Sequence, residues 1–309
     1  MLRRSLVLLP MICSISLAAC SKDETAPNSV SVPYEVEEVT LSQVADDLAS
    51  GKVTSVAVTK VYLSRIEIFD GPLNSIIAIA PDALEQAIAS DKRREDGLSL
   101  GPLDGVPILL KDNIDVAGMP TTAGSYALEA NLPARDSEVA KRLRAAGVII
   151  LGKTNLDQFA GFRTTASFNS STVGGGAHNP YNLANSTCGS SSGSGVAGAV
   201  SFAAGTVGSE TDGSVVCPSS ANGLVGIKPT IALVSRRGVV PISHTQDSTG
   251  PMTRTVKDAA MLLTAMAGSD PEDPQSAEAD AHKTNYVAGL DIGSLKGVRL
   301  GVLRGTQGY

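Results

Sequence analysis

The sequence contains few of the residues on which metal centres depend. Its 309 residues include only three histidines, which lie far apart and away from the cysteines (His178, His244 and His282). Zinc and similar sites in proteins require several such ligands at short, fixed spacings. The pattern therefore excludes a metal centre built from these residues.

Positive charge is scarce as well. The formal net charge is −6, and no basic block follows the N-terminus. This balance argues against a nucleic-acid partner. Hydrophobic residues make up 42% of the chain and charged residues 18%, which is an ordinary globular composition that can bury a sizeable core.

The N-terminal apolar stretch, residues 6–17, is too short to span a bilayer comfortably. It follows Arg3-Arg4 and precedes Ala18-Ala19, an arrangement typical of an export signal. The ending Leu-Ala-Ala-Cys resembles a bacterial lipobox, which implies that Cys20 is lipidated. An ordinary signal peptide that happens to contain a cysteine is the alternative.

These features predict a lipoprotein signal peptide at 1–20, a flexible polar tether at 21–38 and a folded domain at 39–309. The protein is expected to be exported and held in the cell envelope by its lipid anchor. The residue after Cys20 is Ser21 and not an aspartate. By resemblance to bacterial lipoproteins, this favours the outer membrane, facing the periplasm, if the cell is Gram-negative.

Helix-patterned segments alternate with short apolar runs beyond the tether. Helical spacing of apolar residues predicts helices over 41–50, 54–69, 81–95, 137–146, 194–204 and 256–267. Apolar runs predict strands over 76–80, 106–110, 148–151 and 297–303. This alternation predicts an α/β fold whose sheet is covered on both faces. Because the last predicted strand has no helix after it, we expect the domain to be truncated at its C-terminus.

A Gly/Ser-rich run at 188–195 satisfies several short patterns. Residues 193–198 match the G-x-G-x-x-G of dinucleotide-binding loops, but a loop rather than a strand precedes them. Residues 189–193 match G-x-S-x-G, with Ser191 as the nucleophile of a hydrolase elbow. That interpretation also requires a preceding strand, as well as a histidine in a suitable later loop. A flexible linker is the third alternative, although dense apolar pattern flanks the run.

A longer set of motifs in this region resembles the amidase signature family of serine hydrolases. It consists of Leu-Lys-Asp-Asn at 110–113, Gly-Ser-Ser-Ser-Gly-Ser at 189–194, Thr-Asp-Gly-Ser at 211–214 and Gly-Leu-Val-Gly-Ile-Lys-Pro-Thr at 223–230. The motifs occur in the family's order, and the resemblance extends from about residue 41 through residue 252 and beyond. The Thr-Asp-Gly-Ser turn is most similar to the peptide-amidase branch. The resemblance implies the amidase signature fold, with a mixed central β-sheet.

The resemblance also implies a mechanism in which Ser214 attacks a carboxamide carbonyl. A serine hydroxyl needs a base beside it, and no histidine lies in these motifs. By resemblance Lys111 is that base, with the proton relayed through Ser190, which follows a cis peptide bond in the family. The backbone amides of Thr211, Asp212, Gly213 and Ser214 would form the oxyanion hole of this Ser-cisSer-Lys triad. No cofactor and no metal is required.

Several neighbouring residues have competing interpretations. Lys153 and Lys228 also follow apolar strands, and we expect them to be structural lysines that bond loop carbonyls. Asp212 has either a purely structural role or a role in binding a substrate ammonium or amide group. We expect turn and helix-start roles for Ser191, Ser192 and Ser194, because serine caps helices well. Cys188 and Cys217 could pair in an oxidising envelope, but small buried cysteine is the commoner case and the favoured interpretation.

The sequence thus predicts an amidase acting on a small-molecule or peptide amide, with contact to the membrane only through the lipid anchor. Two alternatives stay open. One is a truncated, non-catalytic envelope lipoprotein of the same fold. The other is an amidotransferase A-like subunit, against which the signal at 1–20 and the acidic balance argue.

Overall fold

The computed structural model describes residues 34–162 and 171–301. The predicted signal peptide, Cys20 and most of the tether lie outside them. Within the described residues, no helix is long and apolar enough to cross a membrane. The folded unit begins at Tyr34, five residues before the boundary expected from sequence. The Tyr34 hydroxyl donates to Asp47 over 2.7 Å, and Val36 is buried in the core.

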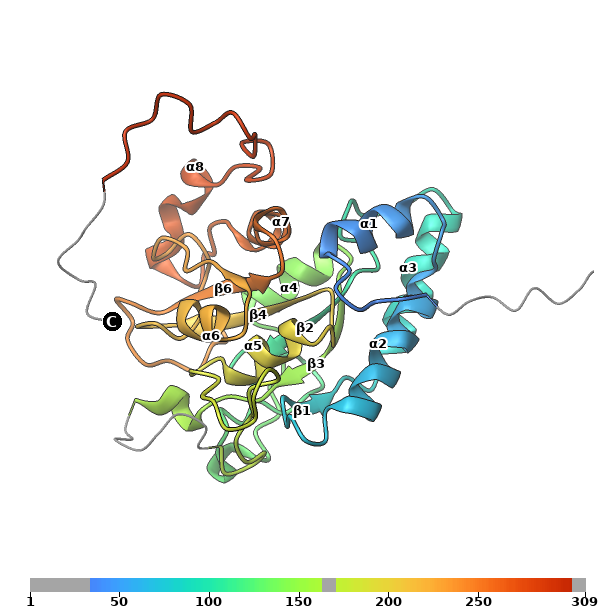
Figure 1. The fold of residues 1–309 in the computed structure, drawn as a ribbon. Coiled ribbons are helices and arrows are strands. Elements are labelled where there is room, and N and C mark those ends of the chain that lie inside the picture. Colours follow the sequence, from blue (N-terminus) through green and yellow to red (C-terminus); the bar gives the residue numbers. More distant parts are fainter. Residues whose placement is uncertain (1–33, 163–170, 302–309) are drawn as a thin grey trace, which may run out of the picture. The chain divides into compact units, whose positions relative to one another are not determined.

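Eight α-helices and three 3₁₀ helices are present in the described part of the chain (Figure 1). The α-helices are α1 (Leu41–Ala49), α2 (Ser55–Phe69), α3 (Ala83–Glu95), α4 (Glu138–Ala145), α5 (Ser192–Ala199), α6 (Val216–Ala221), α7 (Val256–Met266) and α8 (Ala279–His282). The 3₁₀ helices are η1 (Tyr126–Leu128), η2 (Gln158–Gly161) and η3 (Pro274–Glu278). Helix α2 begins as predicted, because Thr54 caps it by accepting from the Ala57 N–H.

Six strands form one mixed sheet in the order β1-β3-β2-β4-β6-β5. They are β1 (Ile76–Ile79), β2 (Pro107–Lys111), β3 (Ile149–Thr154), β4 (Gly205–Glu210), β5 (Val225–Gly226) and β6 (Ser248–Thr253). Strand β2 pairs in parallel with β3 and β4, whereas β1, β6 and β5 are added by antiparallel pairings. Because parallel strands end at the same edge of a sheet, the C-terminal residues of β2 and β4 come together there.

Helices cover both faces of this sheet, as the sequence predicts. A side chain at Gly205 of β4 would meet Leu41 of α1 and Leu262 of α7. The next residue, Thr206, faces the opposite way and donates to the Ser194 carbonyl of α5 over 3.0 Å. Successive strand residues point to opposite faces, so α1 and α7 lie on one side of β4 and α5 on the other.

Two predicted elements differ from the structure, and the strands β4 and β6 were not predicted. Helix α5 ends at Ala199, and the rest of the predicted helix 194–204 leads into β4. No strand forms over 297–301, where the residues are exposed; 302 and 303 lie outside the described residues. An apolar run becomes a strand only beside a sheet edge that can pair with it, and the run itself does not show where that edge is.

Candidate active site

Lys111 ends β2, and its side chain is completely buried. The amine Nζ lies 2.8 Å from Ser190 Oγ, 3.0 Å from Ser209 Oγ and 3.2 Å from the Ser209 carbonyl oxygen. Burial lowers the pKa of Lys111 to about 7, against the opposing effect of the carboxylates of Asp157, Glu210 and Asp247. Desolvation disfavours the charged form of an amine. A large share of Lys111 is therefore neutral near pH 7 and can accept a proton.

Ser190 lies in the loop before α5, and the Gly189–Ser190 peptide bond is cis. Its side chain is buried, and its carbonyl oxygen accepts from the Asp157 N–H over 3.2 Å. The structure thus brings together two of the three predicted triad residues, Lys111 and Ser190, from segments far apart in the sequence.

Ser214 lies between β4 and α6, and it is joined to the Ser190 segment through the backbone. Its carbonyl oxygen accepts from the Ser191 N–H over 3.2 Å. The Ser214 hydroxyl makes no hydrogen bond to another described residue, and the Ser190 hydroxyl is bonded to Lys111. All three predicted triad residues therefore lie at one edge of the sheet, with a hydrogen bond formed between the first two.

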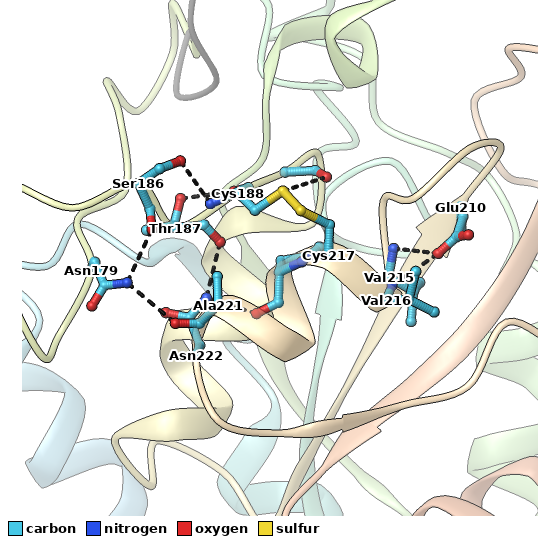
Figure 2. Close-up of a disulfide and its surroundings, with 12 residues drawn as sticks. Asn179, Ser186, Thr187, Cys188, Glu210, Val215, Val216, Cys217, Ala221 and Asn222 are labelled. Carbon is cyan, nitrogen blue, oxygen red and sulfur yellow. Dashed lines mark hydrogen bonds between the residues drawn. A yellow bond between two sulfur atoms is a disulfide. The ribbon is translucent and has the colours of Figure 1, made fainter. Parts of the chain in front are cut away.

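The predicted oxyanion-hole residues 211–214 form the loop that leaves β4. The Glu210 carboxylate at the base of the loop accepts from the N–H groups of Val215 and Val216, over 2.7 and 2.9 Å (Figure 2). Gly213 has a φ of 79°, in the left-handed region that favours glycine. None of the N–H groups of 211–214 donates to an acceptor within 34–162 or 171–301. Asp212 is exposed.

Cys188 and Cys217 form a disulfide with a Cα–Cα distance of 5.8 Å (Figure 2). The favoured sequence interpretation, free buried thiols, was therefore wrong: the fold places next to each other two cysteines that are 29 residues apart. Cys188 lies two residues before Ser190, and Cys217 three residues after Ser214. The bond therefore ties the segments that carry the two serines. A cross-link over a loop of this length contributes about 3–4 kcal/mol in the chain-entropy model.

Asparagine side chains support the same two segments around the disulfide. Asn222 donates to the Thr187 carbonyl over 3.0 Å, and Asn179 donates to the carbonyls of Ser186 and Ala221 over 3.0 and 3.3 Å (Figure 2). The bonds from Asn222 to Thr187 and from Asn179 to Ala221 join the loop before Cys188 to the end of α6, and the bond from Asn179 to Ser186 lies within that loop. The serine segments are consequently held at several points that do not depend on the active-site hydroxyls.

The two other lysines have structural environments, as expected. Lys153 on β3 is buried and bonds the Pro120 carbonyl over 3.2 Å, but it also forms an ion pair with Asp112 over 2.9 Å, which the sequence did not indicate. Burial lowers the pKa of Lys153, and the Asp112 carboxylate opposes that effect. Lys228 is bonded to the Gln246 carbonyl over 3.1 Å.

Ser191 does not have the exposed position that a hydrolase elbow requires. Its hydroxyl is buried, donates to the Ser209 carbonyl over 3.1 Å and accepts from the Ser209 N–H over 3.2 Å. Ser191 occupies the N-cap position of α5, which begins at Ser192, but its side chain does not cap the helix. The G-x-G-x-x-G alternative also fails, since a loop precedes α5 where a dinucleotide fold has a strand.

Two residues around Lys111 were not indicated by the sequence. Ser209 of β4 contacts the amine twice, and Asn113 places its Nδ2 2.8 Å from Ser209 Oγ. Asn113 belongs to the same motif as Lys111, but no sequence pattern indicated its contact with Ser209. In the ranges that the structure describes, no group of three or more histidine, cysteine, aspartate or glutamate side chains is arranged to hold a metal ion.

The mixed sheet with helices on both faces matches solved amidase structures. The Amidase family matches residues 57–308, and this chain belongs to that family. It is 42% identical over 275 residues to a glutamyl-tRNA(Gln) amidotransferase subunit of Streptomyces coelicolor, covering 89% of this chain and 54% of that protein.

Two solved peptide amidase structures are similar to the described fold. The native peptide amidase from Stenotrophomonas maltophilia is 49% identical with a TM-score of 0.76, covering 78% of this chain and 50% of that one. A peptide amidase in complex with the competitive inhibitor chymostatin is 47% identical with the same TM-score and the same coverage of both chains. The chain thus spans about half the length of the relatives it matches.

Proposed function

We propose that this chain carries the catalytic residues of an amidase that hydrolyses carboxamide C–N bonds, with peptide amides as the first substrate class to test. The observation that carries the proposal is the buried amine of Lys111, 2.8 Å from Ser190 Oγ and with its pKa lowered to about 7. A neutral amine in this position is a general base for a serine hydroxyl. The peptide amidase structures, one of them with a competitive inhibitor, support the substrate class.

In the proposed mechanism Ser214 attacks the carbonyl carbon of the amide. Its proton passes to Ser190, while the Ser190 proton passes to Lys111. The protons return along this path to the leaving ammonia or amine, and water then hydrolyses the acyl-enzyme. This relay requires a hydrogen bond between Ser214 and Ser190, and catalytic hydrogen bonds commonly form only when substrate is bound.

The negative charge that develops on the carbonyl oxygen in the transition state needs hydrogen-bond donors beside that oxygen. The N–H groups of residues 211–214 have no protein acceptor within the described part of the chain, and they lie in the segment that carries Ser214. Loss of one such donor commonly costs about 3–4 kcal/mol of transition-state stabilisation. The Glu210 carboxylate binds only the two N–H groups that follow Ser214, and among the described residues it accepts from none of the N–H groups of 211–214.

The test is to treat the purified chain with a fluorophosphonate probe and to map the modified residue by mass spectrometry. We expect a single adduct, on Ser214, and hydrolysis of peptide amides in preference to small aliphatic amides. Folded protein that forms no adduct and hydrolyses no amide would contradict the proposal and favour a non-catalytic protein of the same fold.

The similarity to a glutamyl-tRNA(Gln) amidotransferase protein supports a second candidate function, amide hydrolysis within an amidotransferase. Glutamine is then the amide to test. Hydrolysis of glutamine that requires an added partner protein, together with no hydrolysis of peptide amides, would favour this second function.

We further propose that the protein is exported and anchored to the cell envelope through a lipid on Cys20. Replacing this residue, Cys20→Ala, is expected to move the protein from the membrane fraction to the soluble fraction, because the only acyl attachment site of the predicted lipobox is lost. Fractionation followed by immunoblotting measures the change, with Cys13→Ala, in the apolar stretch of the predicted signal, as the matched control. Membrane association that survives the Cys20 change would rule out the anchor.

A further inference from the structure

The direction of the hydrogen bonds around Lys111 decides which serine can give it a proton. The amine has three neighbours, namely the Ser190 hydroxyl, the Ser209 hydroxyl and the Ser209 carbonyl oxygen. A neutral amine has two N–H donors and one lone pair. The carbonyl can only accept, so the lone pair must take a proton from one of the two serines. For Lys111 to act as the base in the proposed function, that serine must be Ser190.

Ser209 therefore has to direct its own O–H away from Lys111. Its remaining polar neighbour is the Asn113 side chain, which presents Nδ2 at 2.8 Å. In that orientation Asn113 donates to Ser209 Oγ, and the Ser209 O–H is left with the lone pair of Lys111 as its acceptor. At the same time Asn113 Oδ1 is buried and has no hydrogen-bond partner.

A half-turn of the Asn113 amide gives the Ser209 O–H an acceptor other than Lys111. The oxygen and nitrogen of an asparagine side chain have nearly the same shape, and their assignment follows from the hydrogen-bond network. With Oδ1 directed at Ser209, the Ser209 O–H donates to Asn113, and Ser209 Oγ accepts from Lys111. The Nδ2 group then takes the place of Oδ1. Asn113 also lines two small cavities, where water or a substrate oxygen can accept from it.

We propose that Asn113 is a positioning residue whose side-chain oxygen accepts the Ser209 O–H and so reserves the lone pair of Lys111 for Ser190. The arrangement serves both states of the base. When Lys111 is protonated it donates to all three neighbours, and the Ser209 O–H still needs the Asn113 oxygen. The inference rests on the proposed function, since it concerns how the same base is directed.

The test is the rate of fluorophosphonate labelling as a function of pH, in the wild-type chain and in variants at Asn113. With Asn113→Ala the Ser209 O–H turns to the amine, which blocks the lone pair and stabilises the neutral amine. We expect the plateau rate to fall about tenfold while the apparent pKa of the profile falls below its wild-type value. The carboxylates of Asp157, Glu210 and Asp247 act on Lys111 in every variant and cancel in the comparison.

The variant Asn113→Asp distinguishes whether the Asn113 side chain acts as a hydrogen-bond acceptor or as a donor to Ser209. A carboxylate still accepts the Ser209 O–H, so the plateau rate should stay near that of the wild type, while its negative charge moves the apparent pKa upward. An Asp variant as slow as the Ala variant at every pH would show that Asn113 acts as a donor, which would overturn the inference.

A double-mutant cycle with Ser209→Ala tests the route of the effect. In the absence of the Ser209 hydroxyl nothing competes for the lone pair, so Asn113→Ala should cause no further loss. An equal loss in both backgrounds would overturn the inference.

Asn131→Ala, which removes one bond to the Thr121 carbonyl, is the matched control, and thermal unfolding checks that each variant is folded. If Asn113→Ala does not fold, the Asp and Ser209 variants carry the test. A wild-type chain without labelling would instead contradict the proposed function.

Discussion

Replacing Ser214 with alanine is expected to abolish both the fluorophosphonate adduct and amide hydrolysis. The change removes the attacking oxygen, and neither Ser190 nor the oxyanion loop can supply a substitute in the same place. Because the Ser214 hydroxyl makes no hydrogen bond to another described residue, its loss should leave the thermal unfolding temperature nearly unchanged. Intact-mass measurement after probe treatment detects the missing adduct.

Ser191→Ala is the matched control for this prediction. Ser191 lies one residue after Ser190 and belongs to the G-x-S-x-G pattern, but its buried hydroxyl holds the backbone of Ser209. Removing it leaves the Ser209 N–H without that partner, at a cost of roughly 1–3 kcal/mol in the free energy of unfolding. The variant should therefore be less stable and yet still labelled. Labelling that survives Ser214→Ala and disappears with Ser191→Ala would favour the hydrolase-elbow interpretation.

Lys111→Met is expected to lower the rate of labelling and of hydrolysis by about 10²–10⁴-fold, the usual contribution of a positioned general base. Methionine has a similar length and cannot accept the serine proton. In the wild-type chain both rates should rise with pH through about 7, because only the neutral amine is a base. The variant should lose this dependence. A profile unchanged by Lys111→Met would show that another group is the base.

The same substitution has a consequence for stability that does not depend on activity. The pKa of Lys111 is about 7 in the folded protein, against an ordinary value of 10.5. Between these two pH values the unfolded chain binds a proton that the folded chain does not, so this group makes the free energy of unfolding rise with pH. The expected slope is up to about 1.4 kcal/mol per pH unit. Below pH 7 and above 10.5 the contribution is flat.

Urea unfolding at about pH 7, 8 and 9, within the window where the two states differ in bound protons, measures this slope in the wild type and in Lys111→Met. The difference between the two proteins should change with pH, since other groups titrate alike in both. Lys228→Met is the control, because it removes a lysine that bonds a loop carbonyl at the surface. Parallel curves for the wild type and Lys111→Met would show that the amine is not desolvated in the folded protein.

Much of the fold could be predicted from local pattern, because its signals lie close together in the sequence. Helices α1, α2, α4 and α7 begin at or within one residue of their predicted starts, where threonine or serine caps accept from the first turn. Strand β4 was not predicted, because its signal is not local. Its sequence, Gly-Thr-Val-Gly-Ser-Glu, has little apolar character, and it forms a strand because β2 and β6 pair with its two edges.

Some residues of the site could likewise be predicted from local motifs, and others could not. The motif order marked Lys111, Ser190 and Ser214 as a group, and the structure places all three at one edge of the sheet. The motifs did not indicate Ser209, the Asn113 contact, or the ion pair between Lys153 and Asp112. Each of these depends on which side chains the parallel register of β2, β3 and β4 brings opposite one another.

The sequence by itself determined the starts of helices α1, α2, α4 and α7, the strands β1, β2 and β3, and the residues that could take part in amide chemistry. Only the tertiary structure decided that Cys188 pairs with Cys217, that Ser191 is buried against Ser209, and that the Lys111 amine is desolvated beside Ser190. The physical reason is that helix caps and apolar periodicity act over a few residues. A disulfide, a buried hydroxyl and a lowered pKa depend instead on atoms that approach only when distant strands pair.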